Sequence, residues 1–230
     1  MSRQPEEITV VDGDTISPGE RDFAALPLVV IENLGRDFGA KRVIHKLDLE
    51  VSAGERVALI GPNGSGKSTL LRCIAGTVTP TRGSIRVDGL SPTSSRARRS
   101  IGFSLSQERS FYLRLSGYAN LLFFARVRGY STRDANKTIE CLSEELELDA
   151  ILSTRADRCS SGMIQQLGFA RALLGTPRIL LLDEPTRSLD QDAVARLWRA
   201  IDRRPECAVV IISHNYEDTE RCTSRVVLPT

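Results

Sequence analysis

The fold of this chain is decided by residues 57–68, which read VALIGPNGSGKS. The first four form a short apolar run typical of a buried strand, and the segment from Ser68 to Ala75 has apolar residues at helical spacing. Between them, residues 61–68 fit the pattern GxxxxGK(S/T) at every fixed position. In such a loop, glycines let successive backbone N–H groups turn toward phosphate oxygens, and the next helix adds its positive N-terminus. The stretch predicts a strand, a phosphate-binding loop and a helix, in that order.

Each residue of this loop has an expected part in binding a nucleotide. Lys67 is expected to place its charge against the β- and γ-phosphates, and the Ser68 hydroxyl to coordinate Mg²⁺. The other expected contacts to the nucleotide come from Gly61, Pro62, Asn63, Gly64, Ser65, Gly66 and Thr69. The alternative is a chance glycine-rich turn, which the strand and helix patterns on either side argue against.

A second apolar run, Ile179–Leu182, predicts another buried strand, and it ends in two acids. Asp183 lies where a carboxylate can hold the Mg²⁺ shell. Glu184 is expected to point the other way from the strand end, toward the γ-phosphate, where it would orient and polarise the attacking water. Many strands end in acids, but this pair follows a phosphate-binding loop in the same chain. Together the two runs predict hydrolysis of a nucleotide.

Composition narrows the class of protein. The 230 residues are 41% hydrophobic and 26% charged, with a net charge of +2. A nucleic-acid partner is not expected, because it usually needs a concentrated basic face, and the basic stretch 96–99 is interpreted as a solvated surface. No apolar run approaches the roughly 18 residues of a membrane span, and residues 1–15 lack the apolar core of a signal peptide. We therefore expect a cytoplasmic protein that reaches a membrane only through a partner.

The rest of the chain predicts an α/β protein. Residues 1–26 are polar and are interpreted as a flexible N-terminal extension, while residues 27–230 form one domain. The pattern between about 107 and 160 is helical and predicts a helical lobe. The other predicted elements are strands at 28–31, 44–51, 84–87 and 208–212, and helices at 191–201 and near Tyr216. Buried strands that alternate with helices indicate a mainly parallel sheet.

These motifs resemble those of ABC transporter ATPases, over residues from about Leu28 to Val227. Residues 159–163 read CSSGM where the family usually reads LSGGQ, and residues 188–190 (SLD) resemble its D-loop. Gln107 lies where the Q-loop glutamine belongs, and His214 follows a predicted strand as the family's switch histidine does. The resemblance implies a P-loop NTPase fold of ABC type. In that fold an antiparallel β subdomain and a helical lobe accompany a mainly parallel core.

The resemblance also implies roles for residues and a head-to-tail dimer that encloses ATP and Mg²⁺. The catalytic group would be Glu184, His214 and Gln107, and the Mg²⁺ ligands Ser68, Gln107 and Asp183. Phe38 would stack on adenine, and Asp190 would act in the D-loop. The residues that reach the second subunit's ATP would be Ser160, Ser161, Gly162 and Met163. Plainer alternatives stay open: Phe38 as a core aromatic, Gln107 as a loop residue, His214 as a strand-end histidine.

The signature departs from the family's usual residues. Its first glycine is replaced by Ser161, its glutamine by Met163 and its leucine by Cys159, and Gln166 stands for the common arginine. The serine and second glycine that contact the γ-phosphate in the family are kept, so we expect hydrolysis at a modest rate. The signature and residues 108–124 resemble ABC-2 type exporters of polysaccharides, lipids or natural products.

That resemblance implies partners: a second copy of the chain and an integral membrane permease. The chain would then lie on the inner face of the cell membrane. The segment from Gln107 to Gly117 is expected to receive a short helix of the permease, through Phe111, Tyr112 and Leu115. The alternative is that these side chains fill the helical lobe's own core.

Two rival functions come from other classes. One is a soluble ABC ATPase that acts on ribosomes, DNA or cofactor assembly. Members of the translation class carry two such domains in one chain, and DNA-repair members insert a long coiled coil. Neither feature is seen in this sequence. The other rival is a regulatory subunit that does not hydrolyse ATP. The presence of Lys67, Asp183, Glu184 and His214 argues against it.

Overall fold

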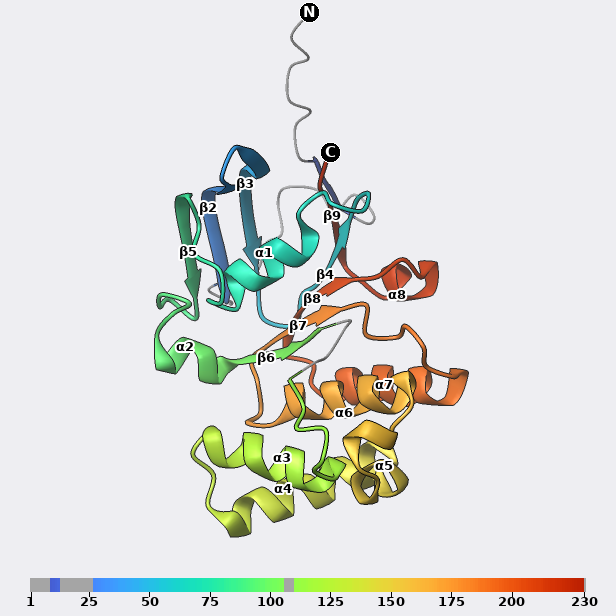
Figure 1. Ribbon diagram of the computed structural model, residues 1–230. Coiled ribbons are helices and arrows are strands. Elements are labelled where there is room, and N and C mark those ends of the chain that lie inside the picture. The colour runs from blue at the N-terminus through green and yellow to red at the C-terminus, as the bar shows by residue number, and fades with distance from the viewer. Residues whose placement is uncertain (1–8, 13–26, 106–109, 230) are drawn as a thin grey trace, which may run out of the picture. The chain divides into compact units, whose positions relative to one another are not determined.

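The computed structural model describes residues 9–12, 27–105 and 110–229 (Figure 1). The chain divides into two compact units, one of residues 1–98 with 208–230 and one of residues 99–207. The phosphate-binding loop and His214 therefore belong to the first unit. Asp183, Glu184 and the signature belong to the second.

A parallel sheet forms the core of the first unit. In it, β4 (Arg56–Ile60) pairs in parallel with β8 (Ala208–Ile212) on one side and with β9 (Ser224–Val227) on the other (Figure 1). All five residues of β8 are buried, as in a strand covered on both faces. On the outer side, β1 (Thr9–Asp12) pairs antiparallel with β9. The segment expected as an N-terminal extension thus contributes a strand.

A second sheet of the first unit is antiparallel. Its central strand β2 (Val29–Phe38) pairs with β3 (Lys41–Val51) and with β5 (Arg82–Val87). Along β3 the buried residues Leu47, Leu49 and Val51 alternate with exposed ones, because only one face of the strand meets the core. The helices of the unit are α1 (Lys67–Ile74), α2 (Ser95–Ser100) and α8 (Tyr216–Glu220). The basic stretch 96–99 lies in α2, where only Ala97 is buried.

The second unit contains a parallel strand pair and five α-helices among its described residues. The strands are β6 (Ile101–Ser104) and β7 (Ile179–Asp183). The helices are α3 (Gly117–Val127), α4 (Thr132–Leu146), α5 (Asp149–Ser153), α6 (Ser161–Leu173) and α7 (Gln191–Asp202), with a 3₁₀ turn at Ala156–Arg158. In Figure 1, α3, α4 and α5 gather at one end of this unit. They form the helical lobe.

Short polar side chains set where these helices begin. Ser116, Ser131, Ser160 and Asp190 precede α3, α4, α6 and α7, and each accepts a hydrogen bond from the backbone N–H three residues on. Such caps satisfy donors that a helix leaves unpaired in its first turn. Two of them, Ser160 and Asp190, are also predicted site residues, so their side chains already have a structural partner within the chain. No helix in the described part of the chain is long and apolar enough to cross a membrane.

Candidate nucleotide-binding site

The phosphate-binding loop joins the end of β4 to the first turn of α1, as its sequence predicts. Gly61 and Gly66 have φ angles of 149° and 98°, a region that favours glycine. Side chains there would also collide with the fold. A Cβ on Gly61 would lie 2.4 Å from the carbonyl oxygen of Leu228, and one on Gly66 would lie 2.9 Å from that of Val43. The curl of the loop is thus specified by its glycines.

The polar groups of this loop fit the phosphates of a nucleotide. Lys67 is 8% exposed, and its Nζ donates to the carbonyl oxygens of Gly61 at 2.6 Å and Pro62 at 2.8 Å, which holds the ammonium beside the loop. The Ser65 hydroxyl is buried and has no hydrogen-bond partner among the described residues. Buried polar atoms are normally paired, so this hydroxyl points to a missing acceptor. The first turn of α1 carries no acidic residue and no side-chain cap, which leaves its N–H groups available for an anion.

Phe38 lies at the end of β2 and is 47% exposed, so it does not fill the core. The guanidinium of Arg36 lies 4.2 Å from the centroid of its ring, and Arg36 Nη1 donates to the carbonyl oxygen of Thr79 at 2.9 Å. A cation over an aromatic face is an attractive contact that fixes the ring. The exposed ring is consistent with stacking on adenine, which stays a prediction.

His214 lies two residues after the end of β8 and is exposed. The residues on both sides of it are held by hydrogen bonds. The Ser213 hydroxyl donates to Asp218 at 2.7 Å and accepts from the backbone N–H of Asn215 at 3.0 Å. Asn215 in turn accepts from the N–H of Glu217 and so begins α8. This turn gives the histidine backbone a defined position at the strand end, in agreement with a role outside the chain's core.

The acidic pair at the end of β7 differs in backbone geometry. Asp183 is the last residue of the strand and is 6% exposed. Glu184 has a φ angle of 52°, a left-handed conformation that is uncommon for a residue with a side chain. The side-chain amide of Gln165, on α6, donates to the carbonyl oxygen of Glu184 at 3.3 Å. The chain therefore turns sharply at Glu184, directly after the last residue of the strand.

The described residues contain no group of three or more His, Cys, Asp or Glu side chains that could hold a metal ion by itself. Mg²⁺ bound with a nucleotide needs only one or two protein oxygens, because phosphates and water supply the rest. Ser68 and Asp183 remain the expected donors. Gln107, the third expected ligand and a predicted catalytic residue, lies outside the described residues.

The signature forms the start of α6. Ser160 accepts a hydrogen bond from the N–H of Met163 at 3.2 Å and is exposed, as is Ser161, so position 161 has room for a side chain. Gly162 has none: a Cβ there would lie 2.6 Å from the carbonyl oxygen of Ser188. The glycine is thus required by packing within the chain. Asp190 accepts from the N–H of Ala193 at 2.8 Å as the cap of α7, and its expected role in a dimer stays a prediction.

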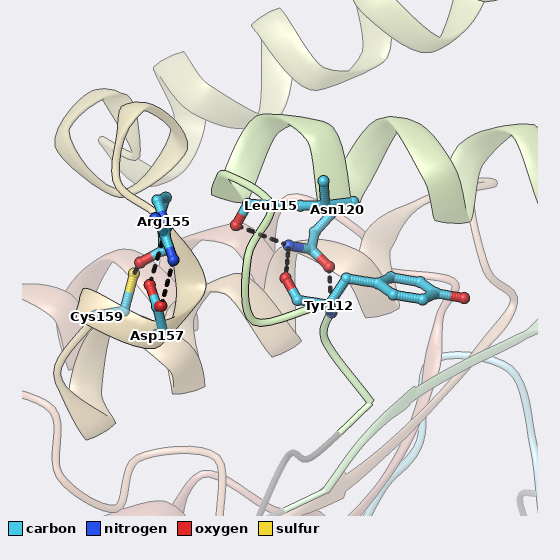
Figure 2. Close-up of polar contacts among 6 residues, drawn as sticks. All are labelled: Tyr112, Leu115, Asn120, Arg155, Asp157 and Cys159. Carbon is cyan, nitrogen blue, oxygen red and sulfur yellow. Dashed lines mark hydrogen bonds and ion pairs between the residues drawn. The ribbon is translucent and has the colours of Figure 1, made fainter.

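The cysteine of the signature also has a defined environment. The Cys159 thiol donates to the carbonyl oxygen of Arg155 at 3.4 Å, beside an ion pair between Arg155 and Asp157 of 2.6 Å (Figure 2). Burial and the neighbouring Asp157 raise the pKa of this thiol. The thiol that stands in place of the family's leucine is therefore a small, neutral, half-buried side chain two residues before α6.

The predicted docking segment has one buried residue, Phe111, and two exposed ones, Tyr112 and Leu115. Phe111 is 5% exposed and packs edge-on against Phe124, so it belongs to the lobe's core. Tyr112 is 49% exposed and Leu115 40%. The backbone of Tyr112 is clasped by the buried side chain of Asn120, which accepts from its N–H at 2.8 Å and donates to its carbonyl oxygen at 3.1 Å. In Figure 2 the tyrosine ring extends away from this clasp.

Two residues near the site carry contacts that sequence reasoning did not assign. Gln165 bonds to Glu184, as described above. Arg171, on α6, donates to the carbonyl oxygen of Phe103 at 3.1 Å and to the Ser110 hydroxyl, and its guanidinium lies 5.4 Å from the ring of Phe111. Both residues follow the signature on the same helix. Their partners lie far away in the sequence, so no local pattern reveals these contacts.

These features define an ABC-type nucleotide-binding fold, and the chain belongs to the ABC transporter family: the family's model matches residues 44–187. Among individual relatives, it is 36% identical over 218 residues to the Nod factor export ATP-binding protein I of Rhizobium meliloti (strain 1021). That match covers 92% of this chain and 63% of the relative. It is also 31% identical to the uncharacterized ABC transporter ATP-binding protein YdbJ of Bacillus subtilis (strain 168), over 89% of this chain and 67% of that one.

Solved structures agree with this assignment. An ATP-binding subunit of an ABC transporter matches with a TM-score of 0.80 and 29% identity, over 87% of this chain and 85% of that one. An ATP-binding cassette solved as a dimer in a post-hydrolysis state, bound to ADP and Pi, matches with a TM-score of 0.78 and 25% identity, over 87% and 94% of the two chains. The predicted family and fold class are confirmed.

Proposed function

We propose that this chain binds and hydrolyses ATP as a subunit that dimerises around the nucleotide and powers export through a separate membrane permease. The observation that carries the proposal is the phosphate-binding loop, in which Lys67 and the unpaired buried hydroxyl of Ser65 fit phosphate oxygens. The structural relative solved with ADP and Pi supports the same use of the fold.

The chain's own residues suggest how hydrolysis proceeds. The loop's N–H groups and Lys67 bind the phosphates, and Glu184 orients the attacking water and accepts its proton. His214, on a turn fixed from both sides, positions the γ-phosphate. Mg²⁺, when bound with ATP, supplies positive charge next to the phosphate oxygens. Preorganised groups of this kind stabilise the charge that develops in the transition state.

A second copy of the chain is the proposed partner for dimerisation. Ser160 and Ser161 are exposed at the start of α6, where backbone N–H groups and the helix dipole favour an anion. A single chain carries every motif, so a homodimer with two equivalent sites is the simplest assembly. A related cassette is a dimer in its solved structure.

The proposed contact with the permease is an exposed group of large apolar side chains, the docking patch, on α3 and the loop before it. Its members are Tyr112, Leu113, Leu115, Tyr118, Phe123 and Val127, each at least 36% exposed. Two of them, Tyr112 and Phe123, pack edge-on at 4.8 Å, and exposed aromatic side chains are typical of an interface. The clasp of Asn120 on Tyr112 gives this patch a fixed backbone, which lowers the entropic cost of binding.

The proposed cargo class is polysaccharide, lipid or natural product, and the proposed location is the inner face of the cell membrane. Support comes from the Rhizobium relatives, whose names assign them to Nod factor export. The test is to purify the chain with its membrane partner and measure ATP hydrolysis of the complex. Steady ATP turnover and a co-purifying permease are expected. An active chain with which no membrane protein co-purifies would favour a soluble ABC ATPase, and a complex without turnover would favour a regulatory subunit.

A further inference from the structure

We propose that Gln165 is a positioning residue for Glu184 and that it links the signature of each subunit to the water-orienting group of the same subunit. This inference rests on the function proposed above, because it assigns Glu184 to hydrolysis. It concerns only residues of the second unit, on α6 and in the turn after β7.

Gln165 reaches this turn from a buried position on α6. It lies one turn into α6, four residues after Ser161, and is 5% exposed. Its amide nitrogen donates to the carbonyl oxygen of Glu184 at 3.3 Å. A buried amide group that loses its hydrogen bond is unfavourable, so this bond resists rotation of the Gln165 side chain away from Glu184.

The residue that receives the bond is held in an unfavourable conformation. Glu184 has a φ angle of 52°, and its carbonyl oxygen also accepts from the N–H of Arg187 at 3.2 Å. Left-handed residues with side chains persist only where the surroundings over-determine them. Fixing the carbonyl fixes the backbone at Glu184, and with it the direction in which the carboxylate leaves the chain.

The signature meets the same turn at a second point. The missing side chain of Gly162 allows its Cα to approach the carbonyl oxygen of Ser188, which is itself left-handed with a φ angle of 67°. Thus α6 contacts both ends of the turn, at Glu184 through Gln165 and at Ser188 through Gly162. When the signature binds the ATP of the second subunit, any shift of α6 is transmitted to Glu184. The two ATP sites of the dimer are therefore coupled through this contact.

The test compares matched variants of the full chain. Gln165→Met removes the donor at nearly constant volume, Gln165→Glu replaces it with an acceptor, and Gln165→Lys keeps a donor. The control, Gln166→Met, makes the same change one residue along, where the side chain lines a small apolar cavity with Leu146 and Phe169. Measurements are kcat and KM for ATP, the Hill coefficient, ATP affinity by calorimetry, and melting temperature.

Loss of one buried hydrogen bond is expected to lower kcat about 3- to 10-fold in Gln165→Met and Gln165→Glu. ATP affinity should stay within about twofold, because the phosphate-binding loop is unchanged. The Hill coefficient should fall toward one, Gln165→Lys should recover most of kcat, and Gln166→Met should match the wild type. This split between kcat and affinity is not expected from a loss of stability alone.

Wild-type kcat in both Gln165→Met and Gln165→Glu would overturn the inference. So would a loss of kcat that follows the melting temperature and is not restored by Gln165→Lys. Failure of the proposed function looks different: the wild type would lack ATP turnover, or Glu184→Gln would hydrolyse ATP as fast as the wild type. If the wild type and Glu184→Gln behave as proposed but the Gln165 variants match the wild type, the inference about Gln165 is rejected and the proposed function stands.

Discussion

Truncation of two adjacent aromatic residues separates the core of the helical lobe from its docking patch. Phe111 is buried at 5% exposure between Phe124 and the guanidinium of Arg171. Replacing a buried aromatic by alanine costs about 3–5 kcal/mol. Tyr112 is 49% exposed, and its ring packs edge-on against Phe123 at 4.8 Å, a pair worth about 0.5–1.5 kcal/mol.

For a chain of this length, 1 kcal/mol shifts the melting temperature by roughly 2–4 °C. Phe111→Ala should therefore melt roughly 6–20 °C lower than the wild type, and Tyr112→Ala no more than roughly 6 °C lower. Differential scanning fluorimetry measures both. Tyr112→Ala should keep the ATPase rate of the isolated subunit and lose co-purification with the permease. A large drop in melting temperature with an intact complex would refute the assignment of Tyr112 to the docking patch.

Three further outcomes follow from single side chains. Lys67→Ala removes the cation beside the phosphate-binding loop and should weaken Mg-ATP binding in calorimetry at least tenfold; unchanged affinity would place the nucleotide elsewhere. Burial alone would raise the pKa of Glu145, but the hydrogen bond and charge of Arg204 lower it below its ordinary value of 4.5. The stability that this pair contributes is present above that value and lost as pH falls through the lower folded pKa, so Glu145→Gln should destabilise more at pH 7 than at acidic pH in urea titrations. Alkylation at pH 8 should modify exposed Cys141 well before Cys222, whose pKa burial raises to about 12; equal rates by mass spectrometry would contradict this.

The sequence predicts those elements in which local pattern and tertiary role agree. The helix expected from Ser68 to Ala75 is α1 at Lys67–Ile74, and the expected strand at 179–182 is β7 at Ile179–Asp183. The four-residue strands β6 and β9 are not predicted. In β6, Gly102 is poor in strand propensity, yet a Cβ there would lie 2.2 Å from the carbonyl oxygen of Ala172. Close packing against Ala172 explains the glycine at this position, and pairing with β7 explains why the segment is a strand despite its low propensity.

In the candidate site, too, the sequence predicts what depends on local pattern and misses what depends on tertiary contacts. The motifs fix which residues are candidates, because their spacing is local. Burial is not local: nothing in the sequence separates Phe111 from Tyr112, although one is core and the other surface. The hydrogen bond between Gln165 and Glu184 joins residues 19 apart in the sequence. It depends on the left-handed conformation of Glu184, which no sequence pattern predicts. The role of Gln107 stays a prediction from the motif.

The account's central claim is that Glu184 drives ATP hydrolysis in a dimer of this chain. Glu184→Gln is nearly isosteric and should bind ATP as the wild type does. It should lose about 10²–10⁴-fold in turnover, since the amide cannot accept the proton of the attacking water. The decisive measurement is gel filtration of this variant with Mg-ATP, combined with its ATPase rate. An ATP-dependent dimer with almost no turnover is predicted. A monomer that hydrolyses ATP at the wild-type rate would contradict the claim.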